Sequence, residues 1–300
     1  MLRILNISGL LMALAFLSCQ PHGPSASGAV GFSDGLGRRV VLPAPPERII
    51  SFAPSLTEMT YALGGQDRLV GVTAWCNHPP QAGNKPKVGD YSAPGWERIV
   101  SLKPDLVILV GTERSPMIDR LKALGIPSAA FRSESVEDVM GEISLLGKII
   151  GRSPQADSMA ALLRARLDSL RPMVDTIAPG KRPRVFAEIS DRPLMTGSDQ
   201  SFLGQLIALA GGVNIAGDMP GTYAAVNPEL VARQRPDVIL VLHPGTTPQD
   251  VRRRLGWSSI PAVRNGRIVS GLDLDLLMRP GPRLAEAALM LHHALYPDEK

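Results

Sequence analysis

The 300-residue chain has little of several residue types, and each shortage excludes a class of protein. It holds only two cysteines, Cys19 and Cys76, so it is not a disulfide-rich secreted scaffold. Its formal net charge is only +4 and it has no run of lysine and arginine longer than the three residues at 252–254, so we expect no nucleic acid partner. With 44% hydrophobic and 20% charged residues, the composition is that of a globular chain long enough for two domains.

Motifs of nucleotide binding and catalysis are missing as well. The chain has no Gly-x-Ser-x-Gly elbow, no phosphate-binding loop and no Gly-x-Gly-x-x-Gly at a strand–helix turn. None of the histidines lies in the paired spacing of a zinc site; they are His22, His78, His243, His292 and His293. Cys76 lacks a convincing base partner and is interpreted as a small packed side chain. We therefore expect a protein that is not an enzyme and has no resident cofactor or metal.

An apolar run occupies the amino terminus, at residues 4–17. Its length fits an export signal better than a membrane-spanning helix, which needs about 20 apolar residues. The run leads into Phe16-Leu17-Ser18-Cys19, which resembles the lipobox of bacterial lipoproteins; ordinary signal cleavage nearby is the alternative. We expect residues 1–18 to be a signal peptide and residues 19–31 a tether lipidated at Cys19. The protein would then be exported to the periplasm or cell surface and anchored to a bacterial membrane.

One stretch of the chain occurs twice, at Glu97–Val110 and at Glu229–Leu242. In each copy a glutamate opens a short segment, a Pro-Asp pair follows, and five apolar residues come next. The first part predicts a short helix that ends before the proline, with its carboxylate in the first turn, where the helix dipole favours negative charge. The apolar part predicts a parallel strand buried on both faces. The repeat therefore predicts two similar halves.

Strands and helices alternate in both halves, which predicts a mostly parallel, doubly wound sheet in each. The clearest strand patterns are at residues 48–52, 70–73, 106–110, 184–188 and 238–242. No strand pattern occurs between Phe131 and Lys181, where a long helix is expected from Ser153 to about Pro172. We predict α/β lobes at residues 32–151 and 181–300, joined by a bridging helix within residues 152–180.

Four segments, in their order along the chain, carry a family resemblance. They are Arg48–Glu58 (RIISFAPSLTE), Val72–Pro80 (VTAWCNHPP), Glu97–Asp105 (ERIVSLKPD) and Asn227–Asp237 (NPELVARQRPD). Over residues 48–297 the chain resembles the solute-binding proteins of ABC importers for cobalamin and iron–siderophores, with the cobalamin binders closest. The resemblance implies the class III architecture, in which two Rossmann-like lobes are joined by a single long helix and the ligand lies in the cleft between them. It also implies a monomer that hands its ligand to a permease dimer.

The resemblance implies four residues that contact the ligand: Pro54, Trp75, Tyr91 and Tyr223. The chain has only 3 Trp, 4 Tyr and 6 Phe, so three aromatic residues in strand-end loops are informative. Flat side chains bury a large area against a broad, mostly apolar disc such as a corrin ring. Packing on the surface of a lobe is the alternative for each aromatic residue. Two further aromatic positions of the family hold Val110 and Ile189 here, so the pocket is less aromatic and the identity of the ligand stays open.

Polar residues of the cleft are implied at two places. The family has a polar pair facing the ligand at the positions of Asp275 and Arg279, and arginine suits amides, carboxylates or phosphate because its planar fork donates two directed hydrogen bonds. A structural salt bridge between the two is the alternative. His78, in a strand-end loop, could be an axial ligand to cobalt or haem iron, and a loop histidine packed beside Pro79 is the alternative.

The repeated glutamates, Glu97 and Glu229, match the two acidic residues by which the family docks onto arginines of the permease. A pseudo-symmetric pair can address a symmetric permease dimer. The alternative role is that of a helix-end charge, which contributes about 0.3–1 kcal/mol, and both roles can hold together.

These observations predict an extracytoplasmic solute-binding lipoprotein that captures cobalamin, another corrinoid or a metal chelate and delivers it to an ABC importer. A siderophore- or haem-binding protein of the same family is the first alternative. An extracytoplasmic hydrolase is the alternative from another class, and the lack of a nucleophile–base pair counts against it.

Overall fold

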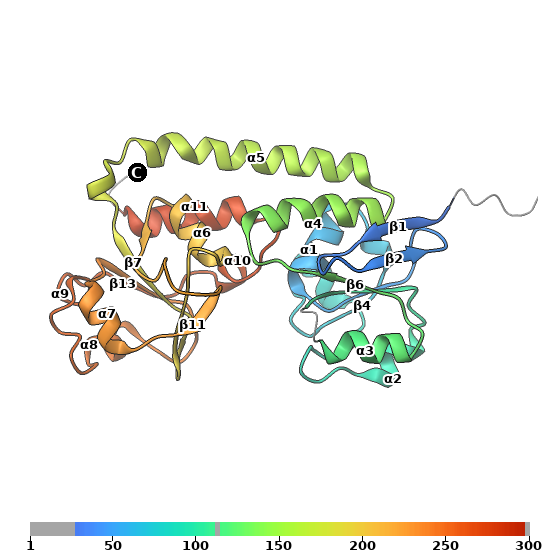
Figure 1. Cartoon of the computed structure of the whole chain (residues 1–300), viewed down its shortest axis with the longest axis horizontal. Coiled ribbons are helices and arrows are strands. Elements are labelled where there is room, and N and C mark those ends of the chain that lie inside the picture. Colours follow the sequence, from blue (N-terminus) through green and yellow to red (C-terminus); the bar gives the residue numbers. More distant parts are fainter. Residues whose placement is uncertain (1–27, 112–114, 298–300) are drawn as a thin grey trace, which may run out of the picture.

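The computed structural model describes residues 28–111 and 115–297, which form two α/β lobes (Figure 1). The long helix α5 (Ser153–Asp175) runs across both lobes on one side of the molecule. This arrangement confirms the predicted fold class of two α/β lobes joined by one long helix. Among the described residues, no helix combines the length and the apolar character needed to cross a membrane. The predicted signal peptide and Cys19 lie outside the described residues.

The amino-terminal lobe is built on a parallel sheet of four strands in the order β4-β3-β5-β6. The strands are β3 (Ile49–Ser51), β4 (Leu69–Val72), β5 (Leu106–Val110) and β6 (Ser128–Phe131). The helices are α1 (Pro54–Ala62), α2 (Trp96–Ser101), α3 (Pro116–Ala123) and α4 (Val136–Ile149), with short 3-10 turns at Gln66–Arg68 and Pro80–Asn84. An antiparallel hairpin of β1 (Val30–Ser33) and β2 (Arg39–Leu42) precedes the sheet.

The carboxy-terminal lobe has a second parallel sheet in the order β10-β7-β12-β13 and a small antiparallel sheet in the order β11-β9-β8. The strands are β7 (Arg184–Glu188), β8 (Ser190–Asp191), β9 (Leu194–Gly197), β10 (Val213–Asn214), β11 (Tyr223–Ala225), β12 (Val238–Val241) and β13 (Ile268–Val269). The helices are α6 (Phe202–Leu209), α7 (Pro228–Gln234), α8 (Pro248–Arg252), α9 (Pro261–Arg264), α10 (Leu274–Leu277) and α11 (Leu284–Leu295), and a 3-10 turn lies at Pro179–Lys181. The antiparallel sheet was not predicted, because its strands are short and carry no clear alternation.

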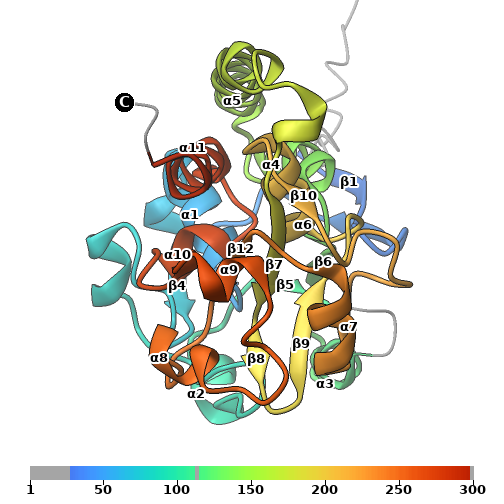
Figure 2. The ribbon, with the colours of Figure 1, turned by 90° about the vertical axis from the view of Figure 1, so that its left-hand side faces the viewer.

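Alternate residues of the central strands face two different cores. Ile49 of β3 and Val185 of β7 both belong to one buried cluster, which continues through α1, α4, α5, α6 and α11 and so includes both lobes. Ile50 and Phe186, their neighbours, face separate clusters on the far side of each sheet. Figure 2 shows the helices of the shared cluster lying on the same side as α5. The strands are therefore buried on both faces, as predicted, and the lobes share one continuous hydrophobic core.

The sequence repeat folds into two matching units, α2–β5 and α7–β12. Lys103 and Arg235, the residues before each proline, have left-handed backbone with φ of 45° and 48°, so each helix ends where the proline disfavours continuation. The aspartate that follows accepts hydrogen bonds from the backbone of the neighbouring strand: Asp105 from Arg48, at 3.0 Å, and Asp237 from Arg184, at 2.9 Å. The Pro-Asp pair thus ends a helix and fixes the position of the following strand relative to its neighbour.

The same two arginines close each unit. The Arg48 guanidinium donates to the carbonyl of Leu102, at 2.7 Å from Nη2, and the Arg184 guanidinium donates to the carbonyl of Gln234, at 3.0 Å from Nη2. Both carbonyls lie at helix carboxyl ends, which leave their last C=O groups without partners inside the helix. The two lobes therefore share a detailed local design as well as a topology.

The bridging helix differs from its prediction at one end. We expected it to end near Pro172, but α5 continues to Asp175. A proline inside a helix loses one N–H bond and crowds the carbonyl four residues earlier. Thr176 N–H still donates to the Pro172 carbonyl at 3.3 Å, so the last turn closes beyond the proline.

Candidate ligand-binding site

The carboxyl ends of parallel strands meet at one edge of a sheet, and there α/β proteins bind ligands. In the amino-terminal lobe Pro54 is the first residue of α1, which begins shortly after β3, and Trp75 lies in the loop after β4. Trp75 is 66% exposed and Tyr91 is 44% exposed, which is high for large aromatic side chains. The Tyr91 hydroxyl hydrogen-bonds to Ser115 Oγ at 2.6 Å, which fixes the ring from its far end. This edge therefore presents two accessible aromatic faces.

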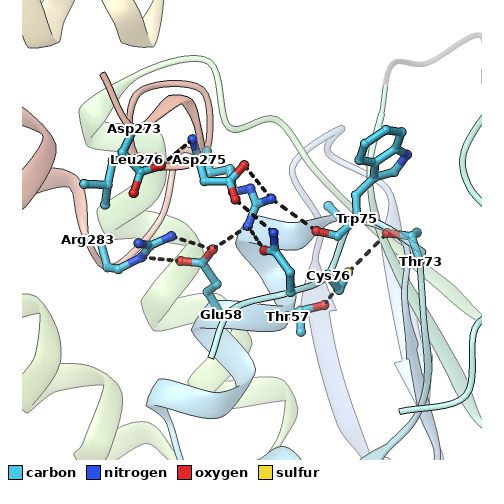
Figure 3. A network of polar contacts seen from close by, with 12 residues as sticks. Thr57, Glu58, Thr73, Trp75, Cys76, Asp273, Asp275, Leu276 and Arg283 are labelled. Carbon is cyan, nitrogen blue, oxygen red and sulfur yellow. Dashed lines mark hydrogen bonds and ion pairs between the residues drawn. The ribbon is translucent and has the colours of Figure 1, made fainter. Parts of the chain in front are cut away.

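The turn that carries Trp75 is anchored from below by Cys76, which is 1% exposed. Its sulfur lies 3.2 Å from the hydroxyls of both Thr57 and Thr73, and Thr57 Oγ1 also donates to Ser51 Oγ at 2.9 Å. Cys76 is a buried packing residue, as predicted. The Cys76 side chain points into the lobe, whereas the Trp75 indole points away from it (Figure 3).

Tyr223 occupies β11 of the carboxy-terminal lobe and is 40% exposed. It pairs with Gly197 on β9, where a Cβ atom would lie 3.1 Å from the tyrosine ring, so the glycine leaves room for the ring. Burial raises the pKa of the Tyr223 hydroxyl, and hydrogen bonds with Leu203 and Ser201 act in the opposite direction. The hydroxyl is thus turned toward the start of α6, and part of the ring remains accessible.

A set of polar residues joins the two lobes, and we call it the interlobe network (Figure 3). It consists of Glu58, the Trp75 carbonyl and Asn77 from the amino-terminal lobe, and Asp275, Arg279 and Arg283 from the carboxy-terminal lobe. Glu58 lies on α1 with its side chain only 3% exposed. Figure 3 shows the Trp75 indole pointing away from the network while its backbone faces it.

Arg283 makes the closest contacts with Glu58. Its Nε and Nη2 donate to the two carboxylate oxygens at 2.8 and 3.0 Å. Burial alone would lower the pKa of Arg283, but the hydrogen bonds and negative charge of Glu58 outweigh it and the pKa is raised. This paired geometry is typical of strong arginine–carboxylate bonds.

Arg279 lies at the centre of the network. Its Nη1 donates to Glu58 Oε1 at 3.2 Å and to Asn77 Oδ1 at 2.7 Å, and its Nη2 donates to the Trp75 carbonyl at 3.2 Å. Nη2 also lies 2.7 Å from Asp275 Oδ1, so the predicted polar pair forms the salt bridge that was the alternative to ligand contact. The Arg279 side chain is only 10% exposed, whereas that of Asp275 is 42% exposed.

A small hollow of about 310 Å³ lies at the matching strand ends of the carboxy-terminal lobe. It is lined by the loops after β12 and β13, including His243, Thr246, Ser270 and Leu274. His243 Nε2 bonds to Glu188 Oε1 at 2.9 Å, and Arg254 holds both oxygens of the same buried glutamate. We did not predict this cluster. The available signal was the place of His243 directly after the apolar run of the second repeat.

His78 and the repeated glutamates have simpler surroundings. His78 is half-buried in the loop after Trp75, and within the described residues no three His, Cys, Asp or Glu side chains gather to hold a metal. Glu97 and Glu229 are exposed in the first turns of α2 and α7. Figure 1 shows these helices on different lobes, both on the side away from α5. Neither glutamate forms an ion pair within the part of the chain that the structure covers.

Comparison with known proteins gives one consistent result. A family model described as periplasmic binding protein matches residues 49–272. The uncharacterized ABC transporter substrate-binding lipoprotein YvrC of Bacillus subtilis (strain 168) is 32% identical over 274 residues, which are 90% of this chain and 86% of that protein.

Solved structures agree with the sequence relatives. The periplasmic vitamin B12 binding protein BtuF of Vibrio cholerae superposes with a TM-score of 0.70 at 28% identity, covering 85% of this chain and 99% of that one. The periplasmic heme-binding protein RhuT from Roseiflexus sp. RS-1 superposes with a TM-score of 0.72 at 27% identity, covering 83% and 99%. The chain therefore belongs to the periplasmic binding protein family, which supplies the substrate-binding proteins of ABC importers and not enzymes.

Proposed function

We propose that this protein captures cobalamin or a related corrinoid between its lobes and delivers it to an ABC importer. The observation that carries the proposal is Trp75, a tryptophan 66% exposed at the carboxyl edge of a parallel sheet and held on an anchored turn. A large aromatic side chain left exposed on a fixed backbone is suited to stack on a flat ligand.

Other features support a broad, partly apolar ligand. Tyr91 and Tyr223 add two accessible rings, one on each lobe. Rigid aromatic residues bury a large area at low entropic cost, because few torsion angles have to be fixed on binding. BtuF of Vibrio cholerae, a structural neighbour at 28% identity, is a vitamin B12 binding protein.

A haem is the second candidate ligand, and it is favoured by two specific observations. RhuT, a heme-binding protein, is as similar to this chain as BtuF is, at 27% identity. His78 also lies half-buried in a loop at a strand end, where a neutral imidazole could coordinate iron. A ferric siderophore belongs to the same group of metal chelates and enters the test below.

The test is equilibration of the purified protein with cyanocobalamin, cobinamide, haem and ferric siderophores in separate samples, followed by gel filtration. Absorbance of the protein peak then reports which chelate is retained. We expect retention of cobalamin and cobinamide near one per protein. Retention of haem alone would transfer the proposal to the second candidate, and retention of none would overturn both.

We further propose that Cys19 carries a lipid anchor and that Glu97 and Glu229 dock onto the permease. The first proposal is supported by the lipobox-like segment and by YvrC, which is named a lipoprotein. The second is supported by the exposure of both glutamates on matching helices. Cys19→Ser should release the protein from membranes or block its maturation, and a correctly processed variant that stays on the membrane would contradict the anchor.

A further inference from the structure

The Arg279 side chain has no terminal N–H group left for a ligand. Its two Nη atoms carry four N–H bonds, and four protein acceptors surround them: Glu58 Oε1, Asn77 Oδ1, the Trp75 carbonyl and Asp275 Oδ1. A guanidinium already satisfied in this way gains little from exchanging these partners for a bound solute, because each exchange breaks a bond to make one.

We propose that Arg279, with Asn77 and Glu58, is a positioning residue that holds the turn presenting Trp75, so that the carboxy-terminal lobe sets the geometry of a ligand contact in the amino-terminal lobe. The inference rests on the proposed role of Trp75 in ligand binding. It assigns Arg279 to a contact between lobes, acting on the ligand only through the tryptophan.

Three consecutive residues of the turn are held from two sides. Cys76, in the middle, is fixed inside its own lobe by Thr57 and Thr73. The residues on either side are fixed by the other lobe: the Trp75 carbonyl accepts from Arg279 Nη2, and the Asn77 amide donates to Asp275 Oδ2 at 3.0 Å while its oxygen accepts from Arg279 Nη1 at 2.7 Å. With the Trp75 carbonyl held by Arg279 and the next two residues held by their side chains, the indole is presented in one place.

The charges of the interlobe network balance. Arg279 and Arg283 carry two positive charges, and Glu58 and Asp275 carry two negative ones. Glu58 is the buried member and accepts from both arginines, so removing either arginine leaves it incompletely paired. The network therefore favours one arrangement of α1 against the segment from α10 to α11, and with it one position of the Trp75 turn. Preorganisation of this kind reduces the ordering that a ligand must otherwise impose.

A double-mutant cycle separates positioning from direct ligand contact. Binding of cyanocobalamin and cobinamide is measured for the wild type, Arg279→Gln, Trp75→Ala and the double variant. If Arg279 acts through Trp75, Arg279→Gln weakens binding by about tenfold in the wild type but by less than about twofold when Trp75 is already alanine. If the fold losses of affinity in the two single variants multiply in the double variant, Arg279 contacts the ligand itself and the proposal is overturned.

Two further variants keep the test decisive. Arg279→Lys retains the positive charge beside Glu58 but has one ammonium in place of the fork, so it should recover thermal stability without recovering affinity. If Arg279→Gln does not fold, Asn77→Ala replaces it, because Asn77 is exposed and its amide joins both Arg279 and Asp275. Arg38→Gln, which breaks a guanidinium–carboxylate pair with Asp34 far from the turn, is the matched control and should leave affinity unchanged.

A readout without ligand distinguishes this inference from the proposed function. The Cys76 amide donates to the Thr73 carbonyl within the turn, and the Ala74 amide donates to the Gly89 carbonyl in a neighbouring loop, so hydrogen exchange at both amides reports the order of the turn. Exchange at these amides should be faster in Arg279→Gln than in the wild type and unchanged in Arg38→Gln. If the wild type binds no chelate but exchange responds in this way, the ligand proposal fails and the positioning role stands. Unchanged exchange in a folded Arg279→Gln variant would overturn the positioning role.

Discussion

The two lobes share their frame and differ at their ligand-facing edges. Each lobe has a short helix that ends at a left-handed residue before a proline. Each also has an arginine and an aspartate whose hydrogen bonds place a central strand. Beyond the strand ends the similarity stops. The first lobe turns directly from β3 into α1 and exposes Trp75, whereas the second extends β7 into an antiparallel sheet that carries Tyr223.

The shared and the differing features of the lobes lie at opposite ends of the strands. The shared bonds lie at the amino ends of the strands and fix backbone groups, which any lobe of this topology requires. The differing residues lie at the carboxyl ends, where ligands bind in parallel sheets. Two buried glutamates also differ between the lobes. Glu188 pairs with Arg254 and His243, whereas Glu142 accepts hydrogen bonds from Ser133 and forms no ion pair among the described residues.

The largest change in affinity is expected at one exposed aromatic ring from each lobe, Trp75 and Tyr223. Trp75→Ala should weaken corrinoid binding by about 2–4 kcal/mol, because it removes the larger and more exposed ring, and Tyr223→Ala should weaken it by about half as much. Titration calorimetry of both variants measures the difference. Leu255→Ala is the control, since Leu255 is 99% exposed and lies outside the site. A larger loss of affinity in Tyr223→Ala would show that the principal ligand contact lies in the second lobe.

Two buried glutamates, Glu142 and Glu188, should respond oppositely to neutralisation. Burial, as the largest cause, raises the pKa of Glu142 from 4.5 to about 7. Its folded pKa exceeds the unfolded one, so its contribution to stability is fully present below pH 4.5 and is lost as the pH rises through about 7. Glu142→Gln should therefore stabilise the protein at pH 8, on the order of 2–3 kcal/mol, and change little at pH 5.

Glu188→Gln is the matched variant in the other lobe. It leaves the partly buried Arg254 without its carboxylate and should destabilise the fold by about 2–3 kcal/mol. Denaturant unfolding of both variants at pH 5 and pH 8 measures these changes. Equal effects of the two substitutions would contradict the distinction between a paired and an unpaired buried carboxylate.

The two aspartates of the repeat should differ by a smaller amount. The Asp105 carboxylate accepts from the backbone N–H groups of Glu47 and Arg48, at 2.8 and 3.0 Å. Among the residues that the structure describes, the Asp237 carboxylate accepts only from the backbone N–H group of Arg184. Asp105→Ala should cost about 1–2 kcal/mol and Asp237→Ala about half of that. Urea unfolding of both variants provides the comparison, and a greater loss at Asp237 would show that the count of backbone bonds does not govern the cost.

The smallest effect on ligand affinity is expected at the docking glutamates. Glu97→Lys and Glu229→Lys, alone and together, should leave the dissociation constant for the ligand nearly unchanged, because both side chains are exposed on α2 and α7. Transport into vesicles containing the permease should fall in each single variant and further in the double variant, since like charges across an interface are costly. Full transport by the double variant would show that these glutamates do not dock onto the permease and act only as helix-end charges.

Much of this frame could be predicted from the sequence because its signals are local. The apolar runs after Pro104-Asp105 and Pro236-Asp237 are too short for helices and are strands buried on both faces. The three strands of the antiparallel sheet escaped prediction, because Ser190–Asp191 is only two residues long and its pairing is set by tertiary contacts. The end of α5 was placed a turn too early, since a proline near a helix end removes only one hydrogen bond.

The site was harder to predict, for a physical reason. Sequence patterns report which residues lie at strand ends, but they do not report which of these meet across the lobes. Asp275 and Arg279 were therefore expected to face the ligand, and their bonds to Asn77 and Glu58, about two hundred residues away in the chain, became visible only in the fold. Glu58 itself carried no signal beyond its place in the first helix. Long-range polar pairing is the information that a single sequence supplies least.

The fluorescence of Trp75 can show whether a bound corrinoid lies against its indole. The chain has 3 Trp, so a Trp96→Phe/Trp257→Phe variant leaves Trp75 as the only tryptophan, and its fluorescence can be followed during titration with cobinamide. The account predicts strong, saturable quenching that ends at one ligand per protein, because the corrin ring lies against the indole. Retention of cobinamide by this variant without any change in Trp75 fluorescence would contradict it.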